Sequence, residues 1–134
     1  EAAAHPRAAE RRESGGRVAE AFRLPGIDTA AALDAFGDDG PRYAAILRQF
    51  VEQHGEDAET ARRLAEVGDT PGALKLLHGL RGMTSILQAR ELGGRVAALD
   101  SALRSGQAAT QPLFEELQGA MRTFGQAVAE LPAI

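Results

Sequence analysis

The chain has 134 residues, of which 44% are apolar and 25% are charged, and its formal net charge is −4. This length suits one domain, and the acidic balance argues against nucleic-acid binding, which usually needs a basic face. The chain has no cysteine and no apolar run near the roughly 20 residues that span a bilayer, so disulfides, thiolate metal sites, a cysteine nucleophile and a transmembrane helix are excluded.

Residues 1–26 are predicted to form a linker that is partly disordered. They contain Pro6, the pair Gly15-Gly16 and the pair Pro25-Gly26, and they mix charges of both signs without apolar periodicity. This linker is expected to contain at most a helical turn at 17–23, and the alternative is a partly ordered first helix. The chain begins with Glu1 rather than methionine, and we expect it to be a piece of a longer protein whose folded domain is 27–134.

From residue 27 onward, apolar residues recur at steps of three and four, which predicts amphipathic helices. The predicted helices cover residues 28–36, 41–67, 70–87, 90–106 and 112–131. Asp28 or Thr29 is expected to cap the first helix and Asp69 the third, and Gly55 to bend or break the second. The second half of the second helix is expected to bury a stripe made of Ala58, Ala61, Leu64 and Val67.

The predicted fold is all-α. Short loops between long amphipathic helices make neighbouring helices antiparallel, and no alternating β-branched pattern indicates a strand. We therefore expect an antiparallel up-down four-helix bundle, preceded by a short extra N-terminal helix.

A lone histidine stands out in the third predicted helix. At 100° per residue, the helix has one core stripe, and His78 lies about 145° from its centre, which places the imidazole on the solvent side. Gly82 is the helical neighbour one turn on, where glycine costs about 1 kcal/mol relative to alanine. We interpret this glycine as leaving the ring open to a large partner, with Lys75 and Arg81 on either side. The alternative is a surface histidine without function and a glycine that serves a packing contact. The core stripe comprises Ala73, Leu77, Leu80, Thr84 and Leu87.

Residues 78–89, HGLRGMTSILQA, resemble the motif H-x-L-K-G-x-[ST]-x-x-[LI]-G-A of histidine phosphotransfer (HPt) domains. The resemblance covers about residues 27–130. Three positions depart from the motif: Arg81 replaces the usual lysine, Gln88 the usual glycine, and Met83 a small residue. We expect the departures at Met83 and Gln88 to narrow access to the far end of the site, and so to affect partner choice more than chemistry. The matching positions are His78, Leu80, Gly82, Thr84, Leu87 and Ala89.

The resemblance implies that His78 accepts a phosphoryl group from an aspartyl phosphate on a receiver domain and passes it to another receiver. A neutral imidazole has a nucleophilic lone pair near pH 7, and the family uses the outward Nε2. Lys75 and Arg81 would offset phosphate charge, and Gly82 would leave room for the partner. The receiver would supply Mg²⁺, so no cofactor is expected in this domain. The expected docking residues, of which Leu74 and Ile86 are taken as exposed, are Leu74, Ser85, Ile86 and Gln88.

The expected partners are receiver domains, without nucleic acid, direct membrane contact or self-association, so that the isolated domain is a monomer. Because no nucleotide-binding stretch is present, we expect no enzyme activity from the domain itself. The parent is expected to be a hybrid sensor histidine kinase, and the location cytoplasmic, at the cytosolic end of that kinase if it is membrane-bound.

Two alternatives to this interpretation remain open. In the first, the domain is the first domain of a chemotaxis-type kinase and is phosphorylated by an ATP-bound kinase domain. In the second, it is an unphosphorylated helical module that docks a receiver or another signalling protein. The other two histidines are too scattered for a metal site. His54, at a predicted helix end, is expected to be structural, and His5 lies in the linker.

Overall fold

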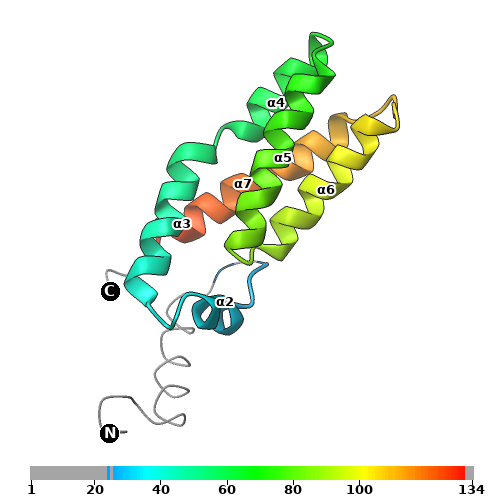
Figure 1. Ribbon diagram of the computed structural model, residues 1–134. Helices are drawn as coiled ribbons and strands as arrows, with labels where there is room; N and C mark the ends of the chain where they lie inside the picture. The colour runs from blue at the N-terminus through cyan, green and yellow to red at the C-terminus, as the bar shows by residue number, and fades with distance from the viewer. Residues whose placement is uncertain (1–23, 25, 132–134) are drawn as a thin grey trace, which may run out of the picture.

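The computed structural model describes Leu24 and residues 26–131, and this part of the chain is helical, as predicted (Figure 1). The predicted linker, with its possible turn at 17–23, lies almost entirely outside the described residues. Within them, the only β-pairing is an isolated antiparallel bridge between Ile27 and Ala89. The helices are α2 (Thr29–Ala35), α3 (Gly40–His54), α4 (Asp57–Glu66), α5 (Thr70–Ile86), α6 (Arg90–Arg104) and α7 (Gln111–Ala129).

Local sequence explains where these helices begin and end. Asp28, Asp39 and Asp69 each cap a helix by accepting a hydrogen bond from the backbone N–H three residues on. The caps predicted at Asp28 and Asp69 are confirmed. Helices α2, α4 and α6 end just before a glycine in the left-handed region, where a side chain would be strained. These glycines are Gly37, Gly68 and Gly106.

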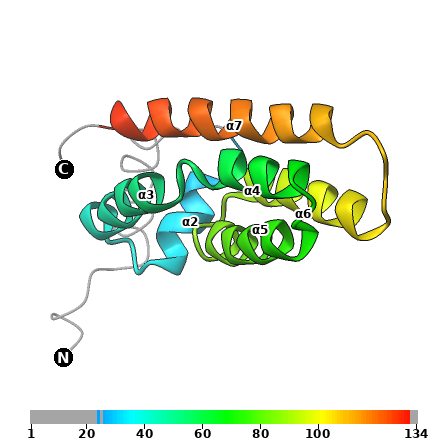
Figure 2. The ribbon, with the colours of Figure 1, turned by 90° about the horizontal axis from the view of Figure 1, so that it is seen from above.

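Four helices form the bundle that carries the fold. Helix α4 packs against α5 and α7, and α6 packs against the other side of α5 and α7. From α4 to α7, each helix runs in the opposite direction to the one before it (Figure 1), so the predicted antiparallel up-down bundle is confirmed. The predicted break at Gly55 is also confirmed, because α3 ends at His54 and α4 begins at Asp57. Helix α3 therefore continues the column of α4, and α7 lies along both of them (Figure 2).

The break between α3 and α4 is held by side chains on both sides of it. His54 Nδ1 lies 2.8 Å from Asp57 Oδ2, and the ring of His54 packs against that of Phe50. His54 thus has the structural role predicted for it. Helix α2 sits near the turn from α5 to α6 (Figure 1), where the Gly26 carbonyl accepts a hydrogen bond from the backbone N–H of Glu91.

The core is built from leucine, alanine and a few aromatic rings. Leu24, within the predicted linker, is buried with it. The stripe predicted along α4 is correct for Ala58 and Ala61, which are buried, and for Leu64, which packs against the core. It is wrong for Val67, which is 79% exposed. Val67 caps the C-terminus of α4, and the chain turns away at the left-handed Gly68 before this side chain can reach the core.

Candidate functional site

The candidate site lies on α5, whose two ends are held in place. At the start, the Asp69 carboxylate accepts a hydrogen bond from Gly72 N at 2.9 Å. At the end, the buried Tyr43 hydroxyl donates to the Leu87 carbonyl over 2.8 Å. Burial raises the pKa of Tyr43, so the hydroxyl keeps its proton and remains a donor. A surface residue on α5 is therefore presented on a helix with little freedom to shift.

The last turn of α5 contains a backbone conformation that glycine would favour. Gln88 has a φ of 62°. Its N–H bonds to the Ser85 carbonyl and the N–H of Ala89 bonds to the Thr84 carbonyl at 2.8 Å, which is the pattern of a Schellman cap. The motif's usual glycine at this position thus has a structural reason. In this chain a glutamine carries the same strained turn.

The helical wheel predicted for α5 is confirmed. All five residues of its core stripe are buried. Thr84 is the polar member of the stripe, and its hydroxyl donates to the Arg81 carbonyl at 2.9 Å, so it does not lie unsatisfied in the core. The opposite face of the helix is exposed, and it includes His78.

His78 lies between two cations that have no ion-pair partner among the residues that the structure describes. Lys75 and Arg81 are both exposed and lie about 60° to either side of His78 around the helix axis, by the rotation of 100° per residue. Among the described residues, none of these three side chains forms a hydrogen bond or an ion pair. The sequence of α5 contains no carboxylate, and Lys75 is the only lysine of the chain. The face around His78 is therefore positive within an acidic protein.

No described residue fills the flank of His78 at Gly82. A Cβ atom added at Gly82 would meet no atom within 4 Å, so no contact with the described residues requires a glycine there. Gly93 on α6 is different, because its Cβ would lie 3.1 Å from Thr84 Oγ1 at the crossing of α5 and α6. The described residues therefore give no packing explanation for Gly82, and the space beside His78 on this flank is open.

Only some of the residues expected to dock a partner are exposed on the same face of α5 as His78. Ser85 is exposed and Ile86 is 57% exposed. Leu74 was expected to be exposed, but it is half-buried, and its position on the wheel is at the border between the core stripe and the solvent face. Gln88 is half-buried as well. Met83 packs against the core, which turns it away from the face that carries His78.

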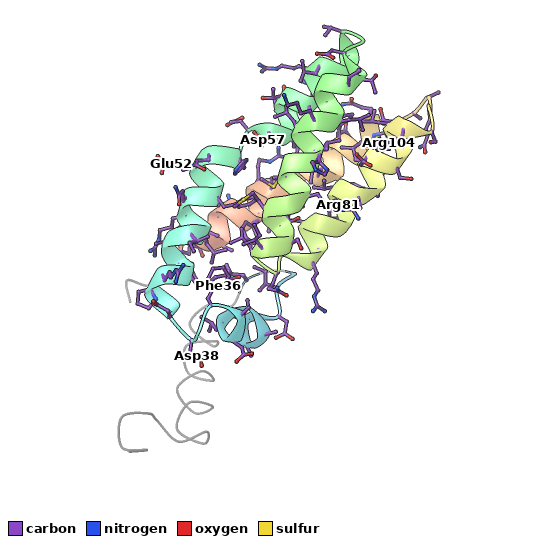
Figure 3. The ribbon with its side chains drawn as sticks, in the orientation of Figure 1. Phe36, Asp38, Glu52, Asp57, Arg81 and Arg104 are labelled. Atoms are coloured by element: carbon purple, nitrogen blue, oxygen red, sulfur yellow. The ribbon has the colours of Figure 1, made fainter. Side chains whose placement is uncertain are left out.

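Sequence reasoning missed a groove next to this face. It lies between α5 and α6, has a volume of about 370 Å³, and is lined by Arg81 and Ser85 on one side and by Gly93 and Gly94 on the other. Figure 3 labels Arg81 on α5, on the side of α6. The pair Gly93-Gly94 inside a predicted helix was the available signal, because two adjacent glycines weaken a helix unless the space that they leave is used.

The part of the chain that the structure describes is thus a four-helix bundle that presents an exposed histidine between two exposed cations. The comparison with protein families agrees: the model of the Hpt domain matches residues 45–129, and the chain belongs to this family. Phosphotransfer in a phosphorelay is the family's general role; its members are phosphocarriers without an ATP site of their own, and they interact with receiver domains. No curated protein and no solved structure matches the chain. None of the described helices is both long and apolar enough to cross a bilayer.

Proposed function

We propose that His78 is the phosphorylated residue of this Hpt domain and that it relays a phosphoryl group from the aspartate of one receiver domain to that of another. The observation that carries the proposal is the exposed imidazole of His78 beside the flank of Gly82, which no described residue fills. A nucleophile that must reach into the pocket of another protein needs this clearance, and a buried or walled-off ring would not have it.

The transfer balances without any group beyond the two proteins and a divalent cation. An imidazole nitrogen of His78 attacks phosphorus in line, the N–P bond forms, and the bond from phosphorus to the aspartate oxygen breaks. The receiver carboxylate leaves as the anion, and the phosphorylated ring releases its proton to solvent. The reverse displacement, with a second receiver aspartate as the nucleophile, passes the group on.

Catalysis in this scheme is positioning and charge compensation, which is what phosphoryl transfer chiefly requires. Lys75 and Arg81 approach the phosphoryl oxygens from the two sides of His78. Arg81 offers a guanidinium fork suited to two phosphate oxygens, and Lys75 a compact ammonium. The receiver brings Mg²⁺ in its acidic pocket, so this domain needs no cofactor of its own.

The docking surface in this proposal surrounds His78 on α5. Ile86 lies eight residues on, about 12 Å along the helix axis, and provides exposed apolar area. Ser85, Leu74 and Gln88 add polar and partly covered contacts around it. Because receivers act inside the cell, the proposal includes a cytoplasmic location, with a hybrid histidine kinase as the parent chain.

Two phosphoryl donors test the proposal. Phosphoramidate, a small N–P donor, needs only an accessible imidazole, whereas a panel of phosphorylated receiver domains with Mg²⁺ needs docking as well. We expect both to place acid-labile, alkali-stable label on the wild-type chain and neither to label a His78→Gln variant. His54→Gln is the matched control. It should take label normally, because His54 contacts Asp57 at the break between α3 and α4 and is not the proposed acceptor.

The outcomes separate the alternatives. Label that persists in His78→Gln would show that the site is assigned to the wrong residue. Binding of receivers without label from either donor would favour the unphosphorylated docking module. If no receiver labels the chain, a kinase domain with ATP is added as a third donor, and label from it would favour the chemotaxis-type arrangement and overturn the relay between receivers.

A further inference from the structure

The groove between α5 and α6 has a distinctive lining. Its walls carry Arg81, Ser85, Gln88 and Arg90, all of which offer hydrogen-bond donors, and none of the described residues that line it is an aspartate or a glutamate. Arg81 and Arg90 are exposed, and neither guanidinium has a hydrogen-bond or ion-pair partner among the described residues. Two uncommitted cations thus stand along one groove of a chain whose net charge is −4.

The groove on the other side of α6 has the opposite character. It lies between α6 and α7, has a volume of about 310 Å³, and is lined by Glu91, Glu115 and Glu116. Its arginine, Arg95, is already engaged, at 3.4 Å from Glu91 and 3.8 Å from Glu116. Helix α6 therefore separates two different grooves. In the α6/α7 groove, Arg95 pairs with neighbouring glutamates, whereas the arginines of the α5/α6 groove have no partner among the described residues.

The floor of the α5/α6 groove on the α6 side is formed by small residues. Gly93, Gly94 and Ala97 line it from α6. A Cβ atom added at Gly94 would meet nothing within 4 Å, so the space above this glycine is not filled by described residues. Two antiparallel helices with a small-residue channel between them can receive the ridge of a third helix, and the alignment of such a helix follows the groove.

We propose that the α5/α6 groove docks a helix of the partner receiver, one that places an apolar ridge over Gly93 and Gly94 and carboxylates opposite Arg81 and Arg90. The inference rests on the proposed function for the class of partner. The charge of the groove argues for this occupant, because a basic or neutral helix would leave both guanidinium groups covered and unpaired.

The position of the groove gives it a role in orientation. Arg81 belongs both to its wall and to the cations beside His78. A receiver helix seated in the groove thus lies next to the imidazole and sets the direction from which the aspartyl phosphate approaches. Receivers with a bulky or basic helix at this position would be rejected, so Gly94 and Arg90 act as specificity-determining residues.

The test fills the groove without touching His78. Gly94→Leu places a side chain in the open space, and leucine is the better helix former, so the variant remains folded. Ala98→Leu places the same side chain at an exposed position of α6 that does not line the groove, and serves as the matched control. Arg90→Glu reverses one charge. The readouts are the dissociation constant for each receiver of the panel, the receiver concentration that half-saturates transfer, and the rate of labelling by phosphoramidate.

We expect Gly94→Leu and Arg90→Glu to raise the dissociation constant and the half-saturating receiver concentration about tenfold or more. Labelling by phosphoramidate should keep the wild-type rate. Ala98→Leu should match the wild type in all three. Values for Gly94→Leu within about twofold of the wild type would overturn the groove proposal, as would the absence of binding by every receiver. Failure of the wild type to label from either donor would instead contradict the proposed function, and the dissociation constants would still decide on the groove.

Discussion

Substitution of Gly82 should separate the stability of α5 from its role in phosphoryl transfer. Gly82 lies inside a helix, its φ is not positive, and a Cβ added there would meet nothing within 4 Å. Alanine at this position should therefore stabilise the fold by about 0.5–1 kcal/mol. For a domain of this size the midpoint of thermal unfolding should rise by about 4 °C.

The same substitution should impair transfer in proportion to its bulk. A side chain at Gly82 occupies the flank of His78 one turn away, so the receiver cannot bring its aspartate as close to the ring. A displacement of about 1 Å between reacting groups can cost on the order of 100-fold in rate. We expect a small loss of transfer rate for Gly82→Ala and a loss of about 100-fold for Gly82→Leu, with both variants at least as stable as the wild type.

A quenched time course of phosphoryl transfer from a phosphorylated receiver measures the transfer rate, and thermal unfolding followed by circular dichroism measures the stability. Gly79→Ala is the matched control. Gly79 is also exposed and has open space at its Cβ, but it lies about 100° around the helix from His78. It should stabilise the domain as much and slow transfer far less. Wild-type transfer by Gly82→Leu would refute the role given to the open flank.

Three further substitutions test the local physics of the fold. Gln88→Gly should raise stability by about 1 kcal/mol in urea unfolding, because glycine accepts the φ of 62° without strain; a loss of stability would contradict the cap. Tyr43→Phe should cost about 1–3 kcal/mol, because it removes the donor to the buried Leu87 carbonyl. Since burial raises the pKa of Tyr43, the wild type should also lose stability as pH rises above about 10, where an unfolded tyrosine ionises, and the variant should lack this slope. Hydrogen bonding to Arg62 lowers the pKa of Glu59 to about 2, so the stabilisation from this carboxylate is present above its unfolded pKa, near 4.3, and disappears as pH falls toward 2. Glu59→Gln should flatten acid unfolding across that interval, and an unchanged profile would argue against the pair.

The sequence was most informative where one face of a helix is sharply apolar. The stripe on α5 placed His78 on the solvent side because leucines at steps of three and four leave little choice of face. The caps at Asp28 and Asp69 followed from local chemistry as well. The error at Val67 arose because periodicity continues past the last residue of a helix, and only the turn at Gly68 decides where the helix face ends.

Features that depend on tertiary contacts were beyond such reasoning. The hydrogen bond from Tyr43 to Leu87 joins residues 44 positions apart, and no sequence pattern in either segment predicts it. Gln88 was recognised as a departure from the motif, but only the backbone shows that the usual glycine serves a left-handed turn. The groove of Gly93 and Gly94 required the crossing of α5 and α6, since adjacent glycines in a sequence predict only a weak helix.

The single lysine of the chain has a practical consequence. Because Lys75 is the only side-chain amine and lies next to His78, reagents that attack primary amines have one side-chain target. A partner lying across α5 should shield this amine, so the extent of acylation would report occupancy without any radioactive tracer. Conversely, attachment of the protein to an amine-coupled sensor surface would obstruct the very contact under study, and tethering through an introduced thiol on α7 avoids that artefact.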